Sequence, residues 1–133
     1  MENTEKMIPE VEQAEFERWA YETKRLRPAV LKKNKDACNT FIDGLCDGTL
    51  TIEEDGSITQ RLAFEIAEKT QLRYKPRLTV AEINRALSVR GSDQDKGRKM
   101  VGILTSELDG VIEKMDSNDW AVANAITVFY YLA

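Results

Sequence analysis

Paired carboxylates are the residues of this sequence that come nearest to catalytic chemistry. The pairs are Glu53 with Glu54, Asp93 with Asp95, and Asp116 with Asp119. General acid–base catalysis needs two carboxyl groups placed around a substrate, in a pocket that separates their pKa values. Each pair lies instead at a predicted turn or helix start, where a carboxylate caps backbone N–H groups and interacts favourably with the helix dipole. The pairs therefore predict a structural role, and we expect no catalytic residue and no enzyme.

The chain has 133 residues and no histidine, which excludes His-based nucleophile pairs and His-containing metal sites. Its two cysteines, Cys38 and Cys46, fall in one predicted helix. At that spacing their Cα atoms lie about 12 Å apart, which is too far for a disulfide. Without further Cys or His ligands they cannot form a zinc site. We interpret both as small core residues of a protein in a reducing compartment.

Residues 43–54 imitate a calcium-binding loop. Asp43, Asp47, Gly48 and Glu54 fall at positions 1, 5, 6 and 12 of such a loop. Leu45 stands at position 3, where an oxygen ligand is required, and the alternating pattern after Gly48 favours a strand over a second helix. We therefore interpret the stretch as a helix end and a turn. No glycine-rich phosphate loop is present either, and we predict no metal and no other cofactor.

Basic residues dominate residues 71–99, where eight bases and three acids give +5, whereas residues 43–68 carry seven acids and one base, giving −6. The basic segment overlaps a helix-turn-helix-like sequence over 79–108. A small nucleic-acid-binding regulator is therefore an alternative function, with contacts from Arg85, Arg90, Arg98 and Lys99. The net charge of −4 and the lack of a helix crowded with Arg, Asn and Gln favour a solvated charged face instead. Part of this run could pair with the acidic hairpin of a neighbouring subunit.

Hydrophobic spacing predicts an α+β protein that is mainly helical, with a small antiparallel hairpin or three-stranded sheet in the middle of the chain. After a loose tail over 1–8, the expected elements are helices over 9–26 and 28–48, a hairpin over 49–66, a third strand over 72–74, and helices over 79–89, from 92 to a break at Gly110, over 111–115, and from 116 to the chain end. We expect residues 1–48 to form an N-terminal helical arm. Residues 49–133 would add a hairpin and a helical bundle, forming one compact domain with the arm. No segment is typical of a signal peptide or a spanning helix, so we expect a cytosolic protein.

The hairpin turn can be specified further. With Glu54-Asp55-Gly56 as a three-residue loop and Gly56 in the left-handed region, Ile52 faces Ile58. This register places the even-numbered residues, including Phe64, on one face, where Gln60 is the only polar side chain.

The best-specified helix start lies at Thr79. Thr79 and Glu82 form a capping box, and Leu78 and Ile83 stand where a hydrophobic staple would form. Ser92 offers a second cap. Glycines 44 and 48 are expected to mark the frayed end of the second helix.

The segment 120–133 is apolar nearly all round and carries no charge after Asp119. Such a helix must be buried on several sides. It is either the central core helix of this chain or a helix that also meets another chain, because a large exposed apolar patch usually marks an interface. We expect association through apolar faces and a homo-oligomer, because the small sheet covers too little of this helix.

Three stretches mark the joints between the later elements. They are Asp55-Gly56 in a hairpin that ends Leu62-Ala63-Phe64, then Leu72-Arg73-Tyr74-Lys75-Pro76-Arg77-Leu78-Thr79, and the acidic step Met115-Asp116-Ser117-Asn118-Asp119 before the final helix. Their order resembles the tail assembly chaperones of long-tailed bacteriophages. The resemblance covers about residues 49–133 and leaves the N-terminal arm unmatched.

The resemblance implies a non-enzymatic protein of the bacterial host cytoplasm. Such chaperones bind the helix-rich tape-measure protein during tail assembly, keep its apolar stripe from aggregating, and help to recruit tail-tube subunits. The expected mode is an amphipathic helix laid in a hydrophobic groove. The candidate groove residues are Trp120, Ile126, Phe129 and Tyr130.

Overall fold

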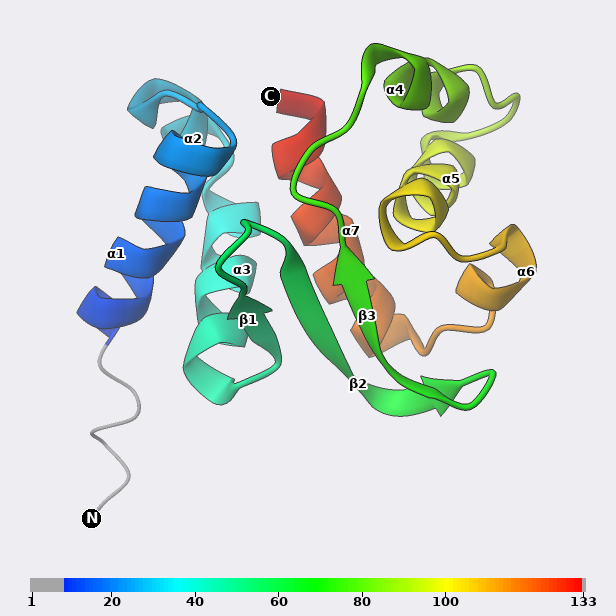
Figure 1. Cartoon of the computed structure of the whole chain (residues 1–133), viewed down its shortest axis with the longest axis horizontal. Helices are drawn as coiled ribbons and strands as arrows, with labels where there is room; N and C mark the ends of the chain where they lie inside the picture. The colour runs from blue at the N-terminus through cyan, green and yellow to red at the C-terminus, as the bar shows by residue number, and fades with distance from the viewer. Residues whose placement is uncertain (1–8, 133) are drawn as a thin grey trace.

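The computed structural model describes residues 9–132, so the tail expected over 1–8 lies outside the described residues. In chain order the elements are α1 (Pro9–Arg18), the π-helical turn η2 (Trp19–Thr23), α2 (Pro28–Lys33), α3 (Lys35–Asp47), β1 (Leu50–Ile52), β2 (Ile58–Ile66), β3 (Lys69–Tyr74), α4 (Val80–Leu87), α5 (Asp93–Thr105), α6 (Asp109–Ile112) and α7 (Ser117–Leu132). Figure 1 shows α1–α3 at one end of the long axis, α4–α6 at the other, and α7 with the sheet between them. The predicted mainly helical α+β class, with its antiparallel sheet in the middle of the chain, is confirmed.

The first helix changes type before it ends. After α1 the chain widens into η2, and Arg25 takes a left-handed φ of 58°. The helix predicted over 9–26 therefore stops at Thr23, and α2 begins at Pro28, where the next helix was expected to start. The predicted apolar stripe is correct where it matters for packing, because Phe16, Trp19 and Ala20 are all buried.

The second predicted helix is divided in two. Asn34 leaves helical geometry with φ −123° and ψ 46°, and its side-chain amide donates to the Val30 carbonyl at 2.9 Å. Gly48 ends α3 in the left-handed region, as predicted. Gly44, in contrast, is buried inside α3. The Leu50 side chain packs so closely on it that a Cβ at this position would lie 2.8 Å away.

The sheet has the strand order β1-β2-β3, with both pairs antiparallel. Ile52 lies opposite Ile58 and Gly56 has φ +90°, so the predicted three-residue turn and its register are confirmed. The third strand is longer than predicted, because it begins at Lys69, directly after a turn at Ala67 and Glu68, which both have positive φ.

One residue of β2 leaves the core face. Phe64 is 58% exposed, although an even alternation would bury it. The reason is an irregular stretch of pairing between Arg61 and Ile66, where the ladder to β3 is interrupted. The backbone N–H groups of Ala63 and Phe64 donate instead to the Asp119 carboxylate, at 2.9 and 3.1 Å.

Asp119 belongs to a buried polar chain that joins three elements. Its carbonyl accepts a 2.9 Å hydrogen bond from Nε2 of Gln60 on β2. The Gln60 Oε1 atom accepts from the Tyr74 hydroxyl of β3 at 2.6 Å. Gln60 and Tyr74 are fully buried, and burial raises the pKa of Tyr74 well above its usual value, which keeps the hydroxyl a donor. The polar residue expected on the apolar face is thus satisfied on both sides of its amide.

In the C-terminal half, α4, α5 and α7 begin within a residue of the predicted starts, whereas the helix predicted over 111–115 is α6 over Asp109–Ile112. Thr79 with Glu82 and Ser92 with Asp95 both form complete capping boxes. Helix α4 ends at Leu87, two residues before the expected end. Helix α5 ends at Thr105 because Ser106 is left-handed, whereas Gly110 lies within α6 and breaks nothing. Leu108, expected on the buried stripe, is 79% exposed.

Aromatic rings join the arm to the last helix. Phe16 of α1 lies 5.0 Å from Phe41 of α3 and 5.2 Å from Phe129 of α7, measured between ring centroids. Trp19 stacks on Phe41 at 5.0 Å. The described residues of arm, sheet and bundle therefore share one hydrophobic core.

A buried lysine also connects the arm to the rest of the chain. Lys24 Nζ donates to the Pro76 carbonyl at 3.1 Å and lies 3.7 Å from the centre of the Tyr130 ring. Burial, and secondarily the Arg77 charge, lower the pKa of Lys24 from 10.5 to about 8.

We expect Asp119→Ala to lower the free energy of unfolding by about 1–3 kcal/mol, because the N–H groups of Ala63 and Phe64 lose their acceptor. Asp119→Asn keeps one acceptor oxygen and is expected to lose less. Urea denaturation measures both, with the exposed Glu113→Ala as the control. Equal stability of Asp119→Ala and the control would contradict this role.

We expect the stability of the wild type relative to Lys24→Met to rise between about pH 8 and pH 10. Below pH 8 both states hold the lysine proton, whereas above pH 8 the folded state has lost it and the unfolded state, with a pKa near 10.5, still holds it. Stability rises with pH wherever the unfolded state binds more protons. Denaturation curves across this range measure the effect, with Lys114→Met, an exposed lysine, as the control. If the unfolding free energies of the wild type and of Lys24→Met change equally with pH over this range, the prediction is refuted.

Candidate functional site

The predicted groove residues of the last helix do not form a groove. Ile126 and Phe129 are fully buried, Tyr130 is 2% exposed, and Trp120 is half-buried. These side chains therefore offer little surface to a partner in the described chain. The physical reason is the arm, whose aromatic residues cover the apolar face of α7.

The alternative nucleic-acid contacts are dispersed. Arg98 pairs with Asp95, and Lys99 Nζ lies 3.9 Å from the Asp109 carboxylate. Arg85 and Arg90 are exposed. Tyr74, the aromatic residue interleaved in the basic run, is fully buried and presents no ring surface for stacking on a base.

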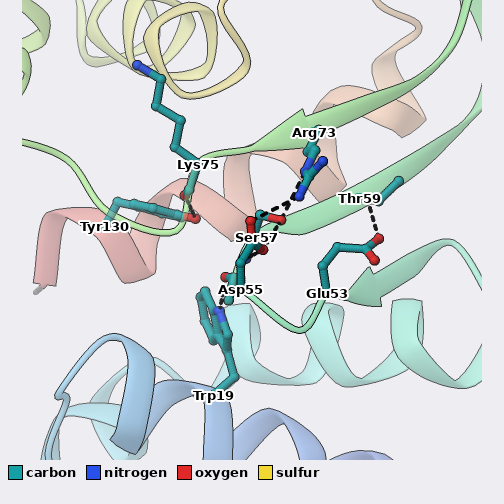
Figure 2. A network of polar contacts seen from close by, with 9 residues as sticks. Trp19, Glu53, Asp55, Ser57, Thr59, Arg73, Lys75 and Tyr130 are labelled. Atoms are coloured by element: carbon teal, nitrogen blue, oxygen red, sulfur yellow. Dashed lines mark hydrogen bonds and ion pairs between the residues drawn. The ribbon is translucent and has the colours of Figure 1, made fainter.

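The turn between β1 and β2 carries the densest polar network, which Figure 2 shows. Ser57 donates to Asp55 through both its N–H, at 2.9 Å, and its hydroxyl, at 2.6 Å. Arg73 of β3 donates to Ser57 Oγ and to the Asp55 carboxylate, each at 3.0 Å. Trp19 Nε1 donates to the Gly56 carbonyl at 2.8 Å, which ties this turn to the arm (Figure 2).

This network suits holding a turn better than catalysis. The hydrogen bonds from Ser57, and secondarily the Arg73 guanidinium, lower the pKa of Asp55. Because its pKa is lowered, the Asp55 carboxylate is a weak base, and it is a poor acceptor of a proton from a serine hydroxyl. Among the predicted carboxylate pairs, Asp95 caps α5 and Asp119 accepts from the backbone of β2, whereas Glu53 accepts a 2.6 Å hydrogen bond from the Thr59 hydroxyl.

A wide apolar opening lies between α1, η2, α2 and α3. It encloses about 580 Å³. Its lining residues are Gln13, Phe16, Glu17, Tyr21, Pro28, Leu31, Lys32, Lys35, Cys38, Asn39 and Ile42. We call this opening the arm groove. Its volume falls within the range of about 300–1,000 Å³ that is usual for ligand sites.

The floor of the arm groove is apolar. Phe16, Leu31 and Cys38 form it, and each is more than nine-tenths buried. Tyr21 and Ile42 stand half-buried at its sides. Burial is also the main reason that the pKa of the Cys38 thiol is raised, which keeps this floor uncharged.

The arm groove lies beside the break at Asn34, with lining residues from both α2 and α3. A single helix over 28–48 would continue in one direction, whereas the two helices α2 and α3 meet at an angle beside α1 (Figure 1). The turn formed by Lys24 to Arg27 is short, so α2 must begin close to the end of η2. The groove therefore follows from two local irregularities in the arm, at Arg25 and at Asn34.

A basic segment borders the arm groove and was missed by the sequence analysis. The exposed members are Arg25, Arg27, Lys32, Lys33 and Lys35, and residues 24–35 contain no acid. None of the five forms an ion pair with another residue within 9–132. A count of charge by segment over the arm would have found this signal, because only the region after residue 43 was compared.

Comparison with protein-family models, with curated proteins and with solved structures finds no match for this chain. Across residues 9–132, no helix combines the length and the apolar character needed to cross a membrane. The same residues hold no cluster of three or more acidic or cysteine side chains suited to a metal ion. The arm groove is accordingly the feature on which a functional proposal can be built.

Proposed function

We propose that this chain is a non-enzymatic phage tail assembly chaperone that holds an apolar helical segment of a tape-measure protein in the arm groove. The observation that carries the proposal is an apolar opening between helices, in which half-buried Tyr21 and Ile42 stand over a buried floor of Phe16, Leu31 and Cys38. The chaperone role itself is supported by the resemblance in residues 49–133. The proposal places the protein in the host cytoplasm and includes recruitment of tail-tube subunits and self-association.

The groove has the properties needed for helix-in-groove recognition. A ligand helix presents apolar residues at i, i+3, i+4 and i+7 along one stripe, and a groove between packed helices receives that stripe. Burial of each apolar side chain removes about 25 cal/mol per Å² of contact with water. Leu31 and Ile42 come from different helices, so a bound helix would contact α2 and α3 together.

The proposed ligand is still an apolar helix, as the sequence led us to expect. The proposed site, however, lies in the arm instead of on α7. Helix α7 contributes Phe129, which supports the groove floor from below through its contact with Phe16. The C-terminal helix therefore acts as a support for the groove, and the arm presents the surface.

We expect Ile42→Gln to weaken binding of an apolar helical peptide about tenfold, because it replaces a half-buried apolar wall of the arm groove with an amide. The probe is a synthetic amphipathic peptide of about 20 residues, with a leucine stripe and neutral polar residues elsewhere, since shorter helices are marginal in water. Fluorescence anisotropy of the labelled peptide measures the affinity.

The matched control is Val80→Gln, another β-branched residue on a helix, which is 74% exposed and lies outside the arm groove. It is expected to bind the peptide as the wild type does. Equal weakening by both substitutions, or no binding by the wild type, would contradict the proposal. Tight binding of duplex DNA with a steep salt dependence would support the nucleic-acid alternative instead.

A further inference from the structure

The two rims of the arm groove differ in charge. Lys32 of α2 and Lys35 at the start of α3 line one rim, and both are exposed. No carboxylate within residues 9–132 pairs with either lysine. Arg25, Arg27 and Lys33 lie in the same segment, and over residues 24–35 the basic side chains give this side of the groove an excess of positive charge.

The opposite rim is formed by α1 and carries a carboxylate. Glu17 lines the groove and accepts a 3.2 Å hydrogen bond from Gln13 Nε2, one turn earlier on the same helix. The charge of Glu17 reaches the groove, since after burial it contributes to the raised pKa values of Tyr21 and Cys38. Within residues 9–132, Glu17 forms no ion pair with a lysine or an arginine.

Opposite charges on two rims discriminate between ligand helices that share the same apolar stripe. A helix that carries carboxylates along one flank is attracted by Lys32 and Lys35 when that flank faces α2 and is repelled by Glu17 when it is turned round. A helix with lysines on both flanks meets repulsion at the two-lysine rim. Such exposed contacts add little to affinity but decide specificity and direction.

We propose, resting on the proposed function of the arm groove, that its ligand is an amphipathic helix whose apolar stripe is bordered by Asp or Glu on the flank that lies against Lys32 and Lys35. The half-buried apolar side chains of Tyr21 and Ile42 supply most of the contact surface, and the lysine rim selects acidic segments and sets the direction in which the helix lies.

The test compares three peptides that share one leucine stripe and carry glutamate, glutamine or lysine at the same flanking positions. Wild-type protein at low salt is expected to bind the glutamate peptide about tenfold more tightly than the lysine peptide, with the glutamine peptide between them. At 500 mM salt the three affinities are expected to converge, because exposed charges are then screened over a few ångströms.

Charge reversal locates the effect. The double variant Lys32→Glu/Lys35→Glu is expected to reverse the order and to bind the lysine peptide more tightly than the glutamate peptide. The matched control Arg85→Glu/Lys114→Glu changes the net charge by the same amount at exposed positions outside the arm, and is expected to keep the wild-type order.

The outcomes separate this inference from the proposed function. Equal binding of all three peptides by the wild type would overturn the inference and leave the apolar groove as a binding site. Absence of binding by every peptide would overturn the proposed function. Reversal of the order in the control variant would also overturn the inference, because net charge and not the rim would then be the selecting property.

Discussion

The buried amide of Gln60 is the contact on which the rest of this structure depends. An amide in a dry core is costly unless its donor and its acceptor are both used. Here the acceptor is used by Tyr74 on β3 and the donor by the carbonyl of Asp119 at the start of α7. The position of α7 relative to the sheet is set in this way. Helix α7 then places Phe129 where α1 packs, and α1 forms one wall of the arm groove.

The parts of the fold that could be predicted from the sequence are those decided by neighbours in the chain. The turn at Gly56 requires a positive φ, and only one loop length aligns Ile52 with Ile58. The capping box at Thr79 uses residues three apart. Such features depend only on residues a few positions apart in the sequence, and the structure confirms them.

The parts that could not be predicted depend on contacts between distant segments. Phe64 turns outward because Asp119, far along the chain, takes the hydrogen bonds of that stretch of β2. The apolar pattern of α7 showed that the helix must be covered but not that the arm covers it. The arm groove escaped for the same reason, since its floor combines residues of three helices whose relative placement depends on the breaks at Arg25 and Asn34.

The contact between Phe16 and Phe129 joins the first described helix to the last, with ring centroids 5.2 Å apart. Contacts of such long sequence separation form late, because loop closure must precede them. During synthesis the arm leaves the ribosome well before α7 and has no support for its floor until α7 follows. A partly synthesised chain that still lacks α7 therefore also lacks the Phe129 ring that packs against Phe16.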